Sequence, residues 1–160
     1  MIISLNITII LLLFLTFYQD MKERKVMLIV LVALFILSGF LHSQFYILEI
    51  FLLNVLLNIT IVSLVLFILF LYTRFVLHKK LFEAFGLGDA IFFLILSISF
   101  PIPTFLVIFS SSLLFAFILS IGLKKSMKDK TIPLAGFQAL FVLLILLSNL
   151  LFNFTNLYQI

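Results

Sequence analysis

The sequence predicts an all-α, polytopic membrane protein with six transmembrane helices. Of its 160 residues, 66% are hydrophobic and only 10% are charged, a composition outside the range of soluble globular domains. The apolar residues form six runs that are separated by short polar segments, as successive membrane spans require. Because no stretch has the composition of a linker or a soluble domain, residues 1–160 are expected to form a single transmembrane domain.

The first three apolar runs are residues 2–18, 26–41 and 45–72. The first run is followed rather than preceded by charged residues, which favours an uncleaved helix over a secretory signal peptide. The second is shorter than the roughly 20 residues of a full span, whereas the third is long enough to span with tilt. Asn54 and Asn58 in the third run are four residues apart, so they share a helix face and are expected to contact another helix.

The fourth apolar run, residues 90–100, is too short to span the membrane by itself. Its helix is therefore expected to begin near Leu81 or Phe85, which places Asp89 inside the first turns. Pro101 ends this helix, because proline has no backbone N–H and clashes with the preceding turn. The last two apolar runs are residues 104–123 and 132–152.

The basic residues give the expected orientation. All ten Lys and Arg residues fall in three segments, 22–25, 74–80 and 124–130, which follow the first, third and fifth runs. Cytoplasmic loops carry an excess of Lys and Arg, so these segments are expected in the cytoplasm and both termini outside. The net charge of +4 then reflects membrane topology and not nucleic-acid binding.

The absence of cysteine excludes disulfides and thiol catalysis. Only His42 and His78 remain as imidazole ligands, which does not favour a zinc site. We therefore expect neither a metal nor a cofactor.

The segment Phe85-Gly86-Leu87-Gly88-Asp89 stands immediately before the fourth apolar run. An aspartate at the edge of the hydrocarbon is costly, so it is a candidate functional residue. Gly86 and Gly88 allow the backbone to approach a neighbouring helix closely or to leave regular helical geometry. Taken alone, Gly-x-Gly-Asp is a weak indication, which a second carboxylate at the same depth would strengthen.

Asp20 is the candidate for this second carboxylate. It follows the first helix and Asp89 opens the fourth, so the expected topology places both at the cytoplasmic face at similar depth. Two neighbouring carboxylates cannot both ionise at low cost, so one is expected to keep a proton. The charged group can deprotonate a water while the neutral group protonates a departing amide nitrogen, as in aspartic proteases. Considered alone, Asp20 beside Lys22 and Arg24 would more often be a solvated loop charge. The remaining loop acids are interpreted as solvated charges: Glu23, Glu83 and Asp129.

Three segments in this order resemble the type IV prepilin peptidase family, in its short form that includes preflagellin peptidases. The first is Asp20 followed by basic residues, and the second is Gly86-Leu87-Gly88-Asp89. The third is the stretch 132–140, which begins Ile132-Pro133 and opens the last helix. The resemblance covers essentially the whole chain in order and topology. The chain departs from the family pattern at three places: Val26-Met27-Leu28 replaces Ile-Pro-Asn, Ile91 replaces a lysine, and Gly136 replaces the second proline of the last motif.

The resemblance implies a multi-pass aspartic endopeptidase of the inner (plasma) membrane. Asp20 and Asp89 would activate a water, with Gly86, Gly88 and Pro133 supporting the site or the substrate. The partners would be the lipid bilayer and a pilin-like precursor protein, whose leader is cut at the cytoplasmic boundary of the membrane. No cofactor is implied, because water is the nucleophile.

Two other classes of protein stay open from the sequence. The chain could be an inactive relative that serves as a non-enzymatic membrane assembly subunit, which the departures at Ile91 and Gly136 would favour. It could also be a small transporter that uses Asp89 as an ion site. A transporter predicts polar residues at mid-membrane depth in several helices, and only Asn54 and Asn58 qualify.

Overall fold

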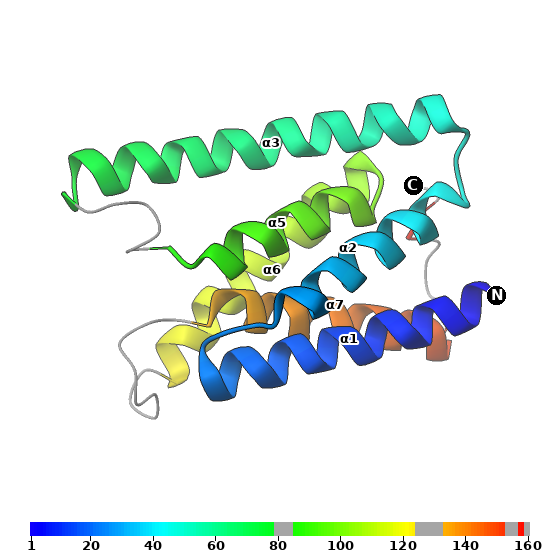
Figure 1. Ribbon diagram of the computed structural model, residues 1–160, viewed down its shortest axis with the longest axis horizontal. Coiled ribbons are helices and arrows are strands. Elements are labelled where there is room, and N and C mark those ends of the chain that lie inside the picture. The colour runs from blue at the N-terminus through cyan, green and yellow to red at the C-terminus, as the bar shows by residue number, and fades with distance from the viewer. Residues whose placement is uncertain (79–84, 124–132, 153–156, 159–160) are drawn as a thin grey trace.

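The computed structural model describes residues 1–78, 85–123, 133–152 and 157–158. Within these ranges the chain is all-helical, without strands, and each predicted apolar run forms a helix (Figure 1). The helices are α1 (Ile2–Glu23), α2 (Leu28–Ser43), α3 (Leu48–Phe75), α5 (Leu87–Ser99), α6 (Ile102–Leu123) and α7 (Leu134–Phe152). The predicted all-α class is thus confirmed for the described part of the chain.

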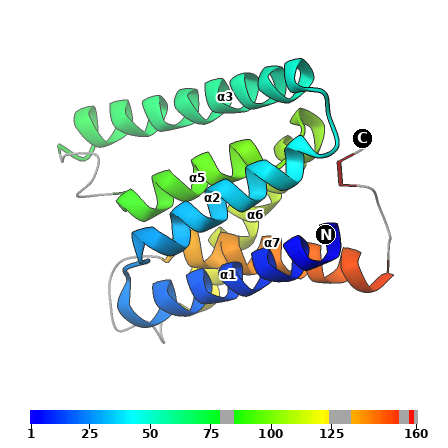
Figure 2. The same cartoon turned by 45° about the vertical axis from the view of Figure 1, so that its right-hand side comes forward.

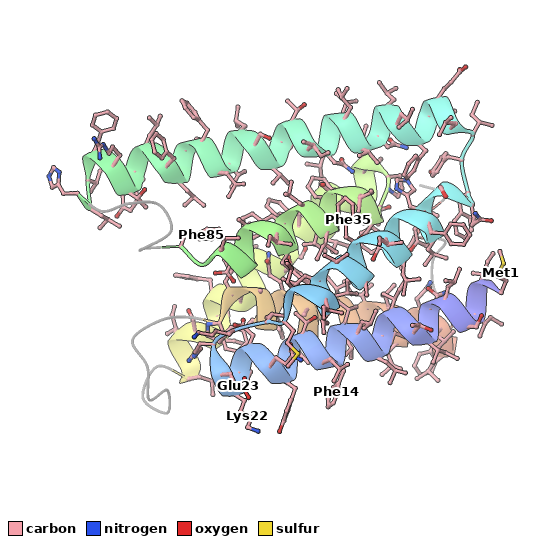
Figure 3. The ribbon with its side chains drawn as sticks, in the orientation of Figure 1. Met1, Phe14, Lys22, Glu23, Phe35 and Phe85 are labelled. Atoms are coloured by element: carbon pink, nitrogen blue, oxygen red, sulfur yellow. The ribbon has the colours of Figure 1, made fainter. Side chains whose placement is uncertain are left out.

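Four of the described helices, α1, α3, α6 and α7, are long and apolar enough to cross a membrane, whereas α2 and α5 are shorter apolar helices. The outer surface of the bundle carries large apolar side chains, as contact with lipid requires. Phe14, for example, points away from the bundle in Figure 3 and is exposed. The chain is therefore a helical membrane protein.

The helices pack in pairs that differ from their order in the sequence. α1 lies along α7, α2 lies along α5, and α6 packs on α7. α3 packs mainly on α5, and in both views it lies on the side of the bundle remote from α1 (Figures 1 and 2). The two termini lie at one end of the bundle, while α1 ends and α5 and α7 begin at the opposite end (Figure 1).

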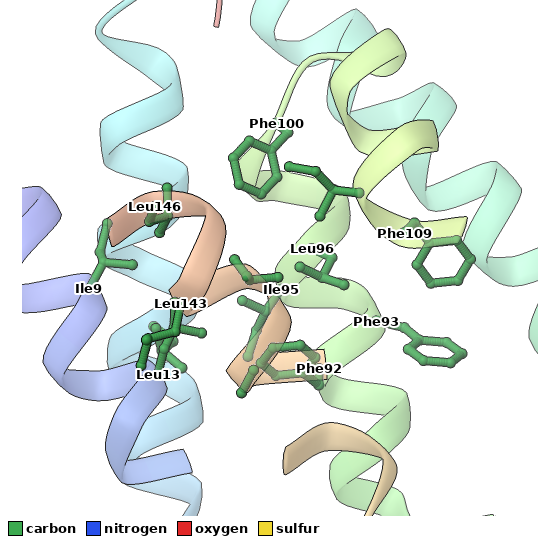
Figure 4. Close-up of a cluster of buried hydrophobic side chains, with 14 of the residues drawn as sticks. Ile9, Leu13, Phe92, Phe93, Ile95, Leu96, Phe100, Phe109, Leu143 and Leu146 are labelled. Carbon is green, nitrogen blue, oxygen red and sulfur yellow. The ribbon is translucent and has the colours of Figure 1, made fainter. Parts of the chain in front are cut away.

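The core contains side chains from all six described helices, and Figure 4 shows mainly the part between α1, α5, α6 and α7. Ile9 and Leu13 of α1 face Leu143 and Leu146 of α7, and all four side chains are buried. These residues recur at intervals of three or four along their helices, so each helix presents one apolar stripe to its partner. This stripe fixes α1 against α7 along its length and thereby sets where its last turn lies.

Asn58 joins α3 to the end of α5. Its side-chain Nδ2 donates hydrogen bonds to the backbone oxygens of Ser97 and Phe100, both at 2.9 Å. The Ser97 oxygen needs a donor because Pro101, four residues later, has no N–H, and the Phe100 oxygen lies at the C-cap where α5 ends. Asn54, one turn earlier, is also buried. The prediction that this face of the third helix makes a helix contact is confirmed.

The helix ends near Asp20 and Asp89 differ from those that the sequence predicts. α1 continues to Glu23, so Asp20 lies in its last turn and not after it. Arg24 ends the helix in a left-handed conformation (φ 55°), with its N–H donating to the Asp20 carbonyl. α5 begins at Leu87 and not at Phe85, because Gly86 has extended dihedrals and acts as its N-cap. The alternative start at Leu81 lies outside the described residues.

The end of the bundle that holds the termini is closed by aromatic side chains. The ring of His42 is fully buried, with Nδ1 2.9 Å from the Ile98 oxygen, and it packs against Tyr46 and Tyr158. Tyr46 donates its hydroxyl hydrogen to the backbone oxygen of Tyr158, and Thr104 donates to that of Leu157 at 2.9 Å. The described C-terminal residues are thus tied to the loop between α2 and α3 and to α6.

Candidate active site

Asp20 and Asp89 meet at the first turn of α7. The Gly136 N–H donates to Asp20 Oδ2 at 2.6 Å, and the Ala135 N–H donates to Asp89 Oδ1 at 2.7 Å. Because these two amides are consecutive, the two carboxylates are close enough to interact electrostatically. The structure therefore brings together the two acids that the sequence singled out, from α1 and α5, at one end of the bundle.

The start of α7 explains why carboxylates bind there. The first N–H groups of any helix have no acceptor within the helix, and they carry partial positive charge. In α7 the Phe137 N–H donates to the Pro133 oxygen at 3.1 Å, which leaves the amides of Ala135 and Gly136 without a helical acceptor. The two aspartates satisfy these amides from outside the helix. Pro133 therefore belongs to the site as the residue directly before α7.

Asp20 is buried, with 7% of its surface exposed. Packing of α1 on α7 covers the carboxylate, and Arg24, one turn later, is near enough to interact with it electrostatically. Asp20 is therefore not a solvated loop charge, which was the more frequent alternative for this residue type. Lys22 and Glu23 are exposed and project away from the bundle in Figure 3, as expected for solvated charges.

Asp89 lies in the first turn of α5 and is half-buried. A Cβ atom on Gly86 would lie 2.8 Å from Asp89 Oδ2, so the absence of a side chain at Gly86 leaves room for the carboxylate. A Cβ on Gly88 would meet no atom within 4 Å among the described residues. Packing among the described residues therefore gives no reason for a glycine at position 88.

The residues that depart from the prepilin peptidase pattern make defined contacts in this structure. Gln19 Oε1 accepts a hydrogen bond from the Met27 N–H at 3.0 Å, which ties the connection between α1 and α2 without a proline. Ile91 is partly buried and packs on the apolar core. Gly136 supplies an N–H that a proline would lack, and this N–H holds Asp20.

The amides of Ala135 and Gly136 were missed by the sequence prediction. Backbone donors belong to every residue, so no residue type marks them. The available indication was that a helix beginning just after Pro133 must leave its first amides without partners.

The described residues contain no cluster of three His, Cys, Asp or Glu side chains that could hold a metal ion. A cavity of about 20 Å³ lies between α1, α2, α5 and α7, and it is lined mainly by apolar side chains such as Leu13, Phe92 and Ile95. Neither Asp20 nor Asp89 lines it, so the cavity is separate from the paired carboxylates.

No family model, curated protein or solved structure matches the chain. The site is thus defined by its own geometry, as a pair of carboxylates at one end of a membrane helix bundle.

Substitutions at Asp89 can separate its hydrogen bond from its charge. Asp89→Asn and Asp89→Ala both remove the negative charge, but only asparagine keeps a side-chain oxygen that accepts from the Ala135 amide. We expect the asparagine variant to be more stable by about 0.5–2 kcal/mol, the usual effect of a helix cap. Thermal unfolding of both variants in the same detergent measures the difference. Equal stability would mean that Asp89 does not cap α7.

Proposed function

We propose that this chain is a membrane aspartic endopeptidase similar to the type IV prepilin peptidases, with Asp20 and Asp89 as its catalytic residues. The observation that carries the proposal is the attachment of both carboxylates to consecutive amides of α7. Asp20 and Asp89 come from different helices and are far apart in the sequence, so their meeting is a property of the fold. Placing two carboxylates next to each other at the edge of an apolar bundle costs free energy, and such an arrangement indicates a functional site.

The chemistry needs one ionised and one neutral carboxyl group. The ionised group takes a proton from a water molecule, and the water oxygen attacks the carbonyl carbon of the scissile peptide bond. The neutral group gives its proton to the amide nitrogen, and the C–N bond breaks. The products are a carboxylic acid on the leader and an amine on the mature protein. The two aspartates exchange their protonation states and return to the start by proton exchange with water.

The proposed topology has six spanning helices, both termini outside and the paired carboxylates at the cytoplasmic boundary of the inner membrane. It is supported by the basic residues Lys22, Arg24 and Lys25, which lie at the end of α1 where Asp20 lies. The other basic segments, apart from Arg74 in the last turn of α3, lie outside the described residues. α5 has 13 residues and a rise of about 20 Å, less than the roughly 30 Å hydrocarbon thickness, which is compatible with a first turn, containing Asp89, that lies below the membrane surface.

The proposed substrate is a pilin-like precursor with a basic cytoplasmic leader followed by a hydrophobic helix. Such a helix would occupy the bilayer beside the bundle, and its cytoplasmic end would reach the depth of Asp20 and Asp89. No atom of the described residues lies within 4 Å of a Cβ built on Gly88, which is consistent with an extended peptide lying next to Asp89. The transporter alternative is less well supported, because Asn58 is engaged in holding the end of α5.

The activity can be tested with Asp20→Asn and Asp89→Asn. Asparagine keeps the size and the hydrogen-bond acceptor of aspartate but cannot transfer the proton, so each variant should lose cleavage by about four orders of magnitude or more. The measurement is processing of a pilin-like precursor in membranes with matched amounts of each variant. The double variant should lose no more than either single variant, because the two residues act as a unit.

Glu23→Gln is the matched control for this test, since Glu23 is an exposed acid three residues from Asp20 in the same helix. It should process the precursor at the wild-type rate. Near wild-type processing by either aspartate-to-asparagine variant would contradict the protease proposal and favour the non-enzymatic alternative.

The orientation can be tested with single cysteines, since the natural chain has none. Gln44→Cys lies at the end of the bundle near the termini, and Lys25→Cys lies at the opposite end; both positions are exposed. An impermeant thiol reagent should label Gln44→Cys in intact cells and Lys25→Cys only after permeabilisation. The reverse pattern would place the paired carboxylates on the outer side and exclude the proposed topology.

A further inference from the structure

We propose that Gly136 is a positioning residue for Asp20, selected at this point of α7 because only a glycine leaves space for the carboxylate. The inference deepens the proposed protease function and rests on it for its kinetic part. Gly136 contacts Asp20 in two ways, through a hydrogen bond from its amide and through the absence of its side chain.

The space at Gly136 is filled by Asp20. A Cβ atom built on Gly136 would lie 2.9 Å from Asp20 Oδ2, 3.0 Å from its Cβ and 3.4 Å from its Cγ. The first of these distances is shorter than a methyl group tolerates beside an oxygen atom. Asp20 is buried, and Gly136 is buried as well, so neither residue can move aside into solvent. Any larger residue would have to push the carboxylate away from α7.

Backbone conformation does not explain this glycine. No glycine among the described residues has a positive φ, so Gly136 adopts a helical conformation that any residue can adopt. Glycine is a poor helix former, and alanine would favour α7 at this position. The feature that alanine would lose is the room for Asp20. The need to leave room for the Asp20 carboxylate therefore explains why α7 has a glycine here despite its low helix propensity.

The position of Asp20 relative to Asp89 follows from this contact. Ala135 and Gly136 are adjacent in a rigid helix, so the hydrogen bonds that they donate fix two carboxylate oxygens at a set separation. If Asp20 is pushed off Gly136 while Asp89 stays on Ala135, the pair is no longer aligned for simultaneous proton transfer. Displacements of about 1 Å at a catalytic group can cost about 100-fold in rate.

The test is Gly136→Ala, which keeps the amide N–H and adds only the methyl group. We expect kcat for precursor cleavage to fall by about 100-fold, with KM changed less than about two-fold, because substrate binding does not require an aligned pair. Gly122→Ala is the first control, since a Cβ there meets no atom of the described residues within 4 Å and both glycines lie in helices. Its kcat should equal the wild-type value.

Gly39→Ala is the second control. Its Cβ would lie 2.9 Å from Ile98 Cδ1, the same distance as the shortest contact at Gly136, but in the contact between α2 and α5. This variant should lower the melting temperature without lowering kcat. Wild-type kcat in Gly136→Ala would overturn the proposal, as would an equal loss of kcat in Gly39→Ala.

A thermal measurement separates this proposal from the protease activity. Asp20→Gly removes the three atoms that lie nearest to the methyl group of Gly136→Ala, namely Oδ2, Cβ and Cγ of Asp20. Gly136→Ala should lower the melting temperature of the wild-type chain, or prevent its folding, but should not lower that of the Asp20→Gly chain. An equal decrease in both backgrounds would overturn the positioning role. If the wild-type chain cleaves no precursor, the protease proposal fails, and this measurement still decides whether Gly136 positions Asp20.

Discussion

The pair of hydrogen bonds from consecutive amides of α7 to two carboxylates is the interaction on which the arrangement of this end of the bundle depends. Asp20 reaches Gly136 only because α1 packs along α7, and Asp89 reaches Ala135 only because α5 begins at the same level. These hydrogen bonds stabilise both the start of α7 and the two carboxylates. The helix start gains acceptors for its free amides, and the carboxylates gain donors and the positive end of a helix dipole. A change in the packing of any of these helices would separate the pair.

The rest of the fold places polar groups where the backbone needs partners. Asn58 supplies donors to the end of α5, where Pro101 cannot, and Thr104 supplies one to the C-terminal segment. These bonds join helices that are distant in sequence, as polar contacts do in membrane proteins. At the end near the termini such contacts are covered by aromatic rings, whereas at the other end no described residue lies within 4 Å of a Cβ atom built on Gly88. Within the described residues, the end of the bundle near the N-terminus is thus held by aromatic packing, and the opposite end is held by the two carboxylates on α7.

Hydropathy and proline positions were sufficient to predict the helices, because a lipid-facing helix must be apolar along its whole length. The position of Asp89 in a first turn and the meeting of two acids also followed from helix order. The sequence could not show that Asp20 is inside α1, because its polar neighbours resemble a loop until Arg24 ends the helix. It could not show the roles of Ala135 and Gly136, because backbone amides have no residue signature. The need for glycine at 136 appears only once α1 is placed against α7.

The central claim is that Asp20 and Asp89 work as one acid–base pair. The most direct measurement is the rate of precursor cleavage by the wild-type protein in membranes, from acid to alkaline pH. The account predicts a bell-shaped profile, because the reaction needs one protonated and one ionised carboxyl group, and both extremes leave the two groups in the same state. A rate that rises or falls in one direction only, with no second limb, would contradict a shared acid–base role for the two aspartates.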